Sequence, residues 1–536
     1  MTPVTTTKMS NFRWVICGLL FLATTINYMD RQVLSLTWKD FIAPEFHWSD
    51  ADYGTITGWF SIFYAIANLL AGKFIDWMGT KKGYLIAIFV WSLGAVLHAG
   101  CGWVTLQIEG YETVAQLGQL TGDAAVAIAT VSVYLFLSCR LILAVGEAGN
   151  FPAAIKVTAE YFPKKDRAFS TSIFNSGASV GALAAPATIP LLARYFKDAG
   201  VGNGWEMAFI IIGALGFIWM GLWMWLYEKP HQSKFVNQAE LNYIEQDNDL
   251  ADVQDKGQPK EEKTIPFWQC FSYKQTWSFI VGKLMTDGVW WFFLFWAPAY
   301  FSDQYGYTSD SAMGIMLILT LYLIVTVLSI GGGYLPTYFV EKRGMNPYLG
   351  RMRAMFIFAC FPLLGLLAQP LGGISAWWPA ILIGLLGAGH QAWSANLFST
   401  IGDMFPKSTI GTITGIGSMA GGLGSFAINK GSGNFFTWAA GKFSFNGNEL
   451  EITRENIEKA FELTKGTIQP GTSASDMVAF ITNHGGQIMS DPWLAMGFEG
   501  KPAAYMVVFS ICAVAYLIGW CIMKSLVPKY KPIVLE

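Results

Sequence analysis

Two sets of ionisable residues lie inside segments that are otherwise apolar, and they are the strongest chemical signal in this chain. Asp30 and Arg31 are adjacent at the end of Asn27–Arg31, and Arg140 and Glu147 are seven residues apart in a later segment. Placing a charge near the centre of a bilayer costs roughly 2.5 to 3.5 kcal/mol on insertion scales. Such groups therefore line a water-filled path or pair with one another, so they indicate solute transport across a membrane.

The spacing within each set limits its chemistry. Neighbouring residues of a helix point about 100° apart, so Asp30 and Arg31 pair poorly and each needs another partner. Seven residues are two helical turns, which places Arg140 and Glu147 on one face. Burial favours the protonated carboxyl and a nearby guanidinium favours the charged form. We therefore expect Asp30, Glu147 and Arg140 to couple protons, with a purely structural ion network as the alternative.

The composition indicates a polytopic membrane protein. Of the 536 residues, 53% are hydrophobic and only 13% are charged, against about 25% charged residues in soluble domains. Apolar segments of the length that crosses a bilayer, about 20 residues, recur along the chain and predict an all-α protein with 12 transmembrane helices. They cover approximately residues 14–36, 53–72, 83–100, 128–149, 168–193, 206–227, 277–301, 311–335, 354–372, 376–400, 410–438 and 503–525.

A polar stretch between Tyr227 and Pro266 divides these segments six and six, and an internal repeat relates the two halves. Glu147 and Phe162 correspond to His390 and Phe405, and both pairs are separated by 243 residues. Duplicated six-helix halves with a substrate site between them describe the major facilitator architecture. We therefore expect three regions and one insertion: a first bundle at 1–227, a cytoplasmic linker at 228–275, a second bundle at 276–536, and an extracytoplasmic insertion at about 441–501.

Four smaller features complete this plan. Residues from about 104 to 123 enlarge a loop on the same side as the insertion. Ala239–Asp247 has the pattern of a short helix, and Gln254–Lys263 that of a flexible linker. Within the insertion, Glu451–Thr464 has a helical pattern and predicts a small external cap.

Lysine and arginine are concentrated in alternate loops, which sets the expected orientation. These loops should face the cytoplasm, with both termini, in the inner membrane of a bacterium. No signal peptide is evident, because the first apolar segment continues into a charged motif. The basic residues of these loops are Lys73, Lys81, Lys82, Lys164, Lys165, Arg167, Lys342, Arg343, Arg351 and Arg353.

The loop Gly72–Lys82 resembles the signature that major facilitator proteins carry between their second and third helices. It predicts a conformational latch, in which Asp76 accepts hydrogen bonds from a helix N-terminus and Gly72 and Gly79 permit close backbone approach. Trp77 stands where the signature has arginine. A basic loop that merely obeys the positive-inside rule is the alternative.

The second half carries polar and aromatic residues suited to a sugar. Amides bind hydroxyls and indoles stack on C–H faces, so His390, Gln391, Trp393, Ser394 and Asn396 are candidate substrate ligands. A histidine hydrogen-bonded within the core is the alternative for His390. An earlier helix adds a comparable set, from which we include Lys283 and Trp291.

Several stretches together resemble the anion:cation symporter family, and within it the hexuronate transporters. The resemblance covers nearly all apolar segments and omits the two enlarged outward loops. The stretches are Asn27–Arg31, Arg140–Pro152, Gln275–Trp277, Gly282–Asp287 and His390–Pro406.

This resemblance implies roles for individual residues. Asp30 and Glu147 would be protonation sites, Arg31 would receive the substrate carboxylate and Arg140 would couple the two. Tyr28, Tyr64 and Asn175 would contact sugar hydroxyls from the first half, and Trp393, Ser394 and Asn396 would close from the second. Gly288 and Ala299 depart from the family pattern, where relatives carry proline and a charged residue.

The expected activity is therefore import of a hexuronate, glucuronate or galacturonate, by proton symport with alternating access. An inside-negative potential opposes entry of an anion by about 2.3 kcal/mol per charge per 100 mV, and one co-transported proton removes this cost. We expect a monomer in contact with membrane lipid, with protons as coupling ion, no cofactor, no metal and no nucleic acid, since the seven cysteines lack metal-ligand spacing.

Three alternatives stay open, and a fourth is disfavoured by the sequence. Within transporters they are a proton symporter of an aldonate, aldarate or other organic anion, and an organic-anion antiporter, which would need a more cationic pocket. A non-transporting membrane sensor would bind without flux. An enzyme acting on lipid-linked sugars would need a nucleophile or metal cluster, and neither pattern is present in the sequence.

Overall fold

The structure is a computed structural model that describes residues 9–246, 265–332, 334–406, 409–463, 468, 472, 474–490 and 500–533. It confirms the all-α membrane fold. The first half contains α1 (Phe12–Thr37), η1 (Trp38–Ile42), α2 (Ala43–Phe46), α3 (Asp50–Met78), α4 (Thr80–His98), α5 (Cys101–Glu109), α6 (Val114–Leu117), α7 (Asp123–Glu147), α8 (Asn150–Tyr161), α9 (Lys164–Asp198) and α10 (Trp205–Leu226).

A polar connection leads from these helices to the second half. The connection contains η2 (Pro230–Gln232), α11 (Gln238–Glu245) and η3 (Phe267–Ser272). The second half contains α13 (Lys274–Tyr305), α14 (Ala312–Gly332), α15 (Leu335–Arg343), α16 (Pro347–Cys360), η4 (Phe361–Leu367), α17 (Ala368–Gly372), α18 (Trp377–Met404), α19 (Ile410–Ala440) and α23 (Gly500–Leu526).

Each of the twelve expected apolar segments lies on a long helix or a run of consecutive helices. Ten helical segments among the described residues have the length and hydropathy to cross a membrane. Helices α18 and α19 are of similar length and pack among them, α18 against α14 and α19 against α3 and α13.

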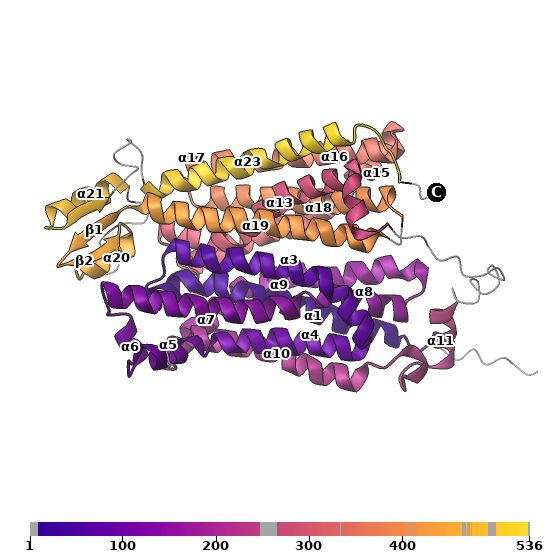
Figure 1. The fold of residues 1–536 in the computed structure, drawn as a ribbon, viewed down its shortest axis with the longest axis horizontal. Helices are drawn as coiled ribbons and strands as arrows, with labels where there is room; N and C mark the ends of the chain where they lie inside the picture. The colour runs from indigo at the N-terminus through magenta and orange to yellow at the C-terminus, as the bar shows by residue number, and fades with distance from the viewer. Residues whose placement is uncertain are drawn as a thin grey trace, which may run out of the picture.

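The two halves lie side by side with their helices roughly parallel (Figure 1). Their longest shared contact joins α3 of the first half to α19 of the second. Small residues allow this contact, because a Cβ at Gly54 would lie 2.7 Å from the Asn429 carbonyl oxygen and 3.0 Å from the Gly433 Cα. Replacing Gly54 by a larger residue would therefore push the halves apart.

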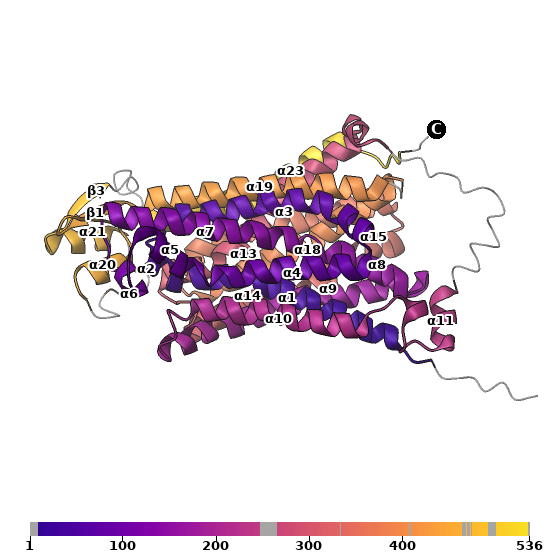
Figure 2. The same cartoon turned by 60° about the horizontal axis from the view of Figure 1, so that its bottom comes forward.

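The molecule has two distinct ends, which we call the termini end and the cap end (Figures 1 and 2). At the termini end, α11 packs on the start of α1, where Glu240 accepts hydrogen bonds from the Phe12 and Arg13 amides at 2.9 and 3.0 Å. Burial alone would raise the pKa of Glu240, but hydrogen bonds from Ser10, Arg13 and Phe12 lower it below its usual value. The helix expected over Ala239–Asp247 is thus present as α11, whereas Gln254–Lys263 lies outside the described residues.

At the cap end, the described part of the insertion forms a small domain that we call the cap. It comprises β1 (Lys442–Phe445), β2 (Asn448–Glu451), α20 (Arg454–Ala460), α21 (Ala474–Asn483) and β3 (Gln487–Ser490). The three strands form an antiparallel sheet in the order β2-β1-β3. Its own core consists of Phe443, Ile452, Ile457, Ile468 and Ile481.

The helix expected over Glu451–Thr464 is only partly correct. Asn446 and Gly447 both have positive φ angles, 51° and 83°, which is the geometry of a tight hairpin turn. This turn places Glu451 in β2 rather than in a helix, and α20 begins only after Thr453, whose side chain accepts a hydrogen bond from the Asn456 amide. Thr464 lies outside the described residues.

Candidate functional site

A buried ion pair joins Arg31 of α1 to Glu147 of α7 in the first half. The Arg31 Nε and Nη2 atoms donate to the Glu147 Oε2 atom at 3.1 and 2.8 Å, and both side chains are almost fully buried. The spacing argument placed Arg140 on the same face as Glu147. In the structure, however, the guanidinium that contacts this carboxylate comes from the neighbouring helix α1.

Aromatic rings from both halves surround the Arg31 guanidinium. Its central carbon lies 4.6 Å from the Tyr64 ring centroid and 5.3 Å from that of Tyr28. Trp291 of α13, in the second half, lies on the same guanidinium at 4.9 Å. Arginine is attracted to aromatic faces at such distances. The structure therefore brings four predicted site residues, Tyr28, Arg31, Tyr64 and Trp291, together at the interface between the halves.

Asp30 and Arg140 lie beside this ion pair with few partners of their own. Among the described residues, neither Asp30 oxygen has a hydrogen-bond partner, and the Arg140 Nη1 atom has none either. The Arg140 Nη2 atom lies 3.5 Å from the Arg31 carbonyl oxygen. Asp30 does not pair with adjacent Arg31, as the helix geometry predicted. A buried polar group without a partner costs about 1 to 3 kcal/mol, so these atoms are available to a proton or a ligand.

Close packing of α4 against α7 positions Arg140 and Glu147. A Cβ at Gly146 would lie 2.2 Å from the Trp91 backbone nitrogen, so only glycine allows the two helices to approach here. Trp91 is thereby held beside Asp30, with its indole nitrogen near the Asp30 carboxylate. Neither Trp91 nor Phe60, whose ring centroid lies 5.3 Å from the Arg140 guanidinium carbon, was predicted from sequence.

In the second half, Lys283 is paired within its own helix. Its Nζ atom lies 2.5 Å from the Asp287 Oδ2 atom and 4.6 Å from the centroid of the Phe398 ring. Lys283 is therefore charge-neutralised here, and a substrate carboxylate would have to compete with Asp287 for it.

His390, Trp393 and Asn396 contact partners within the second half. His390 Nδ1 is hydrogen-bonded to the Tyr516 hydroxyl at 2.6 Å, and its ring stacks on Trp290 with centroids 5.4 Å apart. Trp393 packs edge-on against Tyr516, and Asn396 donates to the carbonyl one turn earlier in its helix. The contacts of His390 are those expected of a histidine that is hydrogen-bonded within the core, which was the alternative to a substrate ligand.

Three further candidates, which are not among the residues that contact the Arg31 ion pair in the described part of the chain, differ in exposure. Gln391 of α18 and Asn175 of α9 are exposed, and Ser394 of α18 is partly buried. Their roles as sugar ligands stay predictions.

The predicted latch lies where α3 meets α4 at the termini end. Gly79 has a positive φ of 77°, which favours glycine, and so terminates α3. A Cβ at Gly72 would meet no atom within 4 Å, so the close approach expected there is not made in this structure. The Asp76 side chain lies outside the described part of the chain.

Two observations narrow where a ligand could bind. No group of three or more His, Cys, Asp or Glu side chains among the described residues could hold a metal ion.

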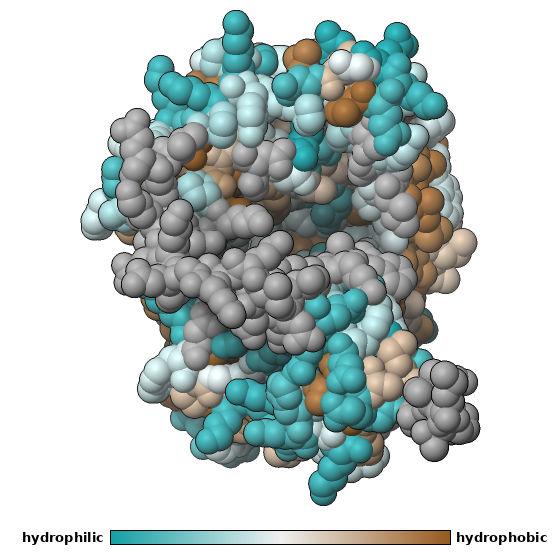
Figure 3. Space-filling view, turned by 90° about the vertical axis from the view of Figure 1, so that its right-hand side faces the viewer, coloured by the Kyte–Doolittle hydropathy of each residue, from teal (hydrophilic) through white to brown (hydrophobic). Residues whose placement is uncertain are grey.

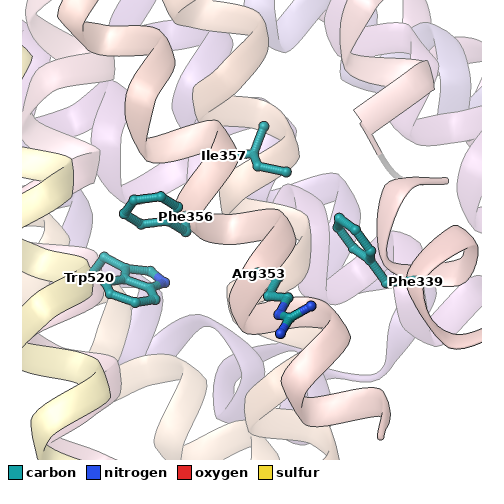
Figure 4. Close-up of a pocket in the computed structure, with 5 residues that line it drawn as sticks. All are labelled: Phe339, Arg353, Phe356, Ile357 and Trp520. Carbon is teal, nitrogen blue, oxygen red and sulfur yellow. The ribbon is translucent and has the colours of Figure 1, made fainter. Parts of the chain in front are cut away.

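A pocket between α15, α16 and α23 is lined by apolar side chains and Arg353, and it lies within the second half alone (Figure 4). It contains none of the candidate residues. It is lined by Phe339, Arg353, Phe356, Ile357 and Trp520.

The halves are joined toward the cap end. The Tyr53 hydroxyl donates to the Phe295 carbonyl at 2.9 Å, and Asp40 accepts from the Ser302 hydroxyl and the Ser309 amide at 2.6 and 2.7 Å. Toward the termini end, the surface recedes between the halves beside the grey atoms (Figure 3). The Arg31 cluster is thus separated from the cap end by direct contacts between the halves.

Comparison with known proteins places the chain among transporters. The family model described as Major Facilitator Superfamily matches residues 20–428. The hexuronate transporter of Escherichia coli strain K12 is 28% identical over 79% of this chain and 88% of its own length. The galacturonate transporter of Dickeya chrysanthemi is 27% identical over 64% of this chain and 87% of its own. The D-galactonate transporter of an Escherichia coli O6:H1 strain is 25% identical over 80% and 90%.

Solved structures resemble the fold along most of the chain. A bacterial homolog of the human lysosomal transporter Spinster, in an inward-facing and unoccupied conformation, has a TM-score of 0.64 at 18% identity and covers 97% of this chain and 99% of its own. A D-xylose-proton symporter has a TM-score of 0.56 at 18% identity, covering 78% and 89%. At these identities the likeness concerns the fold alone.

Proposed function

Because this chain belongs to the Major Facilitator Superfamily, a family of membrane transporters and not of enzymes, we propose that it imports a hexuronate such as glucuronate or galacturonate by proton symport. The observation that carries the proposal is the buried Arg31–Glu147 ion pair, enclosed by aromatic rings from both halves. A guanidinium held among rings suits a sugar acid, since it binds the carboxylate while the rings stack on the sugar.

The relatives support the class of substrate. Four of the relatives are named as hexuronate, galacturonate, D-galactonate and probable galactarate/D-glucarate transporters. These substrates are all small sugar acids, and the two uronates match at the highest identities of the four. A hexuronate is therefore our first choice, and an aldonate or aldarate is the second.

The ion pair suggests how proton and substrate are coupled. Glu147 occupies the guanidinium that a substrate carboxylate would need. When Glu147 binds a proton, it loses its charge, and Arg31 becomes available to the incoming anion. Deprotonation of Glu147 then restores the pair and expels the substrate. Asp30 is a second candidate proton carrier, because both of its oxygens lack partners among the described residues.

Arg140 would sense these changes of charge. It lies near Asp30 and Glu147 and lacks a hydrogen bond at Nη1 within the described part of the chain. Protonating Asp30 and Glu147 would leave the positive charges of the two arginines without a negative partner. One anionic substrate would then neutralise one of these two charges. No cofactor is needed in this scheme, since protons are the only coupling ion.

Alternating access would move the halves about this cluster. Because the positive-inside rule predicts a cytoplasmic termini end, the contacts between halves at the cap end would close the outer side. In this scheme the substrate leaves toward the termini end after Glu147 loses its proton. We further propose that the protein acts as a monomer, surrounded by lipid, in the inner membrane of a bacterium.

The test is uptake into proteoliposomes that contain the purified protein. Labelled glucuronate and galacturonate should accumulate above their external concentration when an inward proton gradient is imposed, and an uncoupler should abolish the accumulation. Unlabelled galactonate and galactarate serve as competitors that rank the sugar acids. If no sugar acid moves while another organic anion does, the substrate proposal is wrong and the membrane fold is unaffected.

A further inference from the structure

Four charged residues that are largely shielded from solvent form a closed ring at the cap end, which we call the charge ring. Lys39 lies 3.5 Å from Asp50 and 3.0 Å from Asp303, and Lys501 lies 2.5 Å from Asp50 and 2.7 Å from Asp303, measured between nitrogen and oxygen. Each lysine thus contacts both aspartates. The side chains are between 0 and 16% exposed.

The charge ring exists only while the two halves touch. Lys39 and Asp50 belong to the first half, and Asp303 and Lys501 belong to the second. Two of its four contacts, Lys39–Asp303 and Lys501–Asp50, cross between the halves. The two lysines and two aspartates carry opposite charges, so the closed ring has no net charge.

The cap adds a fifth charge to this balanced set. Glu451, the last residue of β2, is electrostatically coupled to Asp50, Lys501, Lys39 and Asp303. An ionised Glu451 would be uncompensated, because both lysines are already paired with aspartates. Burial, with the Asp50 charge added, raises the pKa of Glu451 to about 7.

Other charged or titratable groups around Glu451 leave this balance unchanged. Lys442 stands opposite Glu451 in the β1–β2 ladder, but its side chain is exposed to solvent. Tyr505 of α23 donates its hydroxyl to the Asp303 Oδ2 atom at 2.9 Å and so stabilises the ionised Asp303 carboxylate. The cations that lower the electrostatic cost of an ionised Glu451 are the two lysines of the charge ring, Lys501 and Lys39.

The cap also contacts the first half, although it belongs to the second half in sequence. Lys459 of α20 donates to the Gly118 carbonyl at 2.8 Å, within the enlarged loop of the first half. The preceding residue, Leu117, accepts a hydrogen bond from His47 Nε2 at 2.7 Å. The cap is therefore attached to both halves where the charge ring closes.

We propose that Glu451 is a proton-binding site of the cap that controls opening of the cap end. It takes up a proton when the charge ring closes and releases it when the halves separate and water reaches the carboxylate. This inference rests on the proposed alternating access. It concerns the insertion, which the resemblance to sugar-acid transporters does not cover.

The sign of the pH effect follows from the two states of Glu451. At a pH below its ordinary pKa of 4.5, Glu451 is protonated in both states and closure is most favoured. As the pH rises from 4.5 to about 7, closure requires uptake of a proton and becomes progressively less favoured. Above about 7 the carboxylate is ionised in both states and the penalty is constant. In the absence of substrate, a low pH at the cap end should therefore favour the closed state.

The test is a distance measurement between spin labels at the cap end, without substrate. Labels at Ala199→Cys and Ile374→Cys, both exposed positions at this end of different halves, report separation of the halves in a background with exposed Cys521 replaced by Ser. We expect the ratio of closed to open molecules to fall at least threefold between pH 5 and pH 7.5. The Glu451→Gln variant, which mimics the protonated acid, should stay closed at both values.

Two controls separate this site from the rest of the molecule. Glu449→Gln changes an exposed carboxylate of the same strand and should behave as the wild type. A Glu147→Gln background should keep the pH response if Glu451 causes it, whether or not a hexuronate is transported. A wild-type closed fraction that does not change with pH, or a response that survives in Glu451→Gln, would overturn the proposal.

Discussion

The charge ring at the cap end and the cluster formed by Asp30, Arg31, Arg140 and Glu147 of the first half have the same charge composition but different pairing. Each contains two cations and two carboxylates. In the ring every lysine contacts both aspartates, whereas in the cluster only Arg31 and Glu147 are paired. The ring is arranged to hold two surfaces together, and the cluster is arranged to exchange partners.

The cost of unpaired groups explains why this difference matters. Breaking a buried ion pair by removing one partner costs about 3 to 5 kcal/mol, so the ring resists opening. Asp30 and the Nη1 atom of Arg140 already lack partners among the described residues. A proton or a carboxylate that satisfies them releases free energy, and this free energy can drive a change of conformation.

The largest effect is expected at the paired member of the cluster. Arg31→Ala should reduce hexuronate uptake by roughly 100-fold or more at normal expression, because a buried charge pair is broken and the proposed substrate ligand is lost. Arg31→Lys keeps the charge but not the two-nitrogen contact with Glu147, and should retain a small residual rate. Normal uptake by Arg31→Ala, measured in proteoliposomes, would show that Arg31 does not bind the substrate carboxylate.

Two single changes in the charge ring should have unequal effects. Lys501→Gln leaves two aspartates with one lysine and should destabilise closure by about 3 kcal/mol. Asp303→Asn leaves two lysines with Asp50, but Glu451 is close enough to supply the missing negative charge. The spin-label distance should therefore report a larger open fraction for Lys501→Gln than for Asp303→Asn. Equal open fractions for the two variants, or a larger one for Asp303→Asn, would contradict the proposal that Glu451 interacts with the charge ring.

The smallest effect is expected where the second half has satisfied contacts. Tyr516→Phe removes the hydrogen bond to His390 and should cost about 1 kcal/mol of stability, detectable as a lower thermal midpoint. If His390 is a core residue, the KM for the sugar acid should change by less than about threefold. A tenfold rise in KM would instead indicate that His390 contacts the substrate.

The helices that carry the site could be predicted from the sequence, whereas the contacts between their side chains could be predicted only in part. The twelve apolar segments and the poor pairing of Asp30 with Arg31 follow from composition and helix geometry, which act locally. The partner of Glu147 could not be predicted, because helical spacing relates Glu147 to Arg140 in its own helix and says nothing about Arg31 on a neighbouring one.

The charge ring was missed for a similar reason. Its residues stand at positions 39, 50, 303 and 501, near the ends of four different helices, and no periodicity connects them. Within the insertion, the helical pattern of the sequence extends back to Glu451, whereas the hairpin turn at Asn446 and Gly447 places that residue in a strand. The contact between the cap and the ring therefore became visible only in three dimensions.

The most direct test of proton coupling compares two kinds of transport in the Glu147→Gln variant. Wild-type protein should accumulate labelled hexuronate under an inward proton gradient and should also exchange it between equal internal and external pools. Glu147→Gln should lose accumulation but keep exchange, because the amide cannot release a proton while Arg31 remains available to the substrate. Gradient-driven accumulation by Glu147→Gln at the wild-type rate would contradict the account.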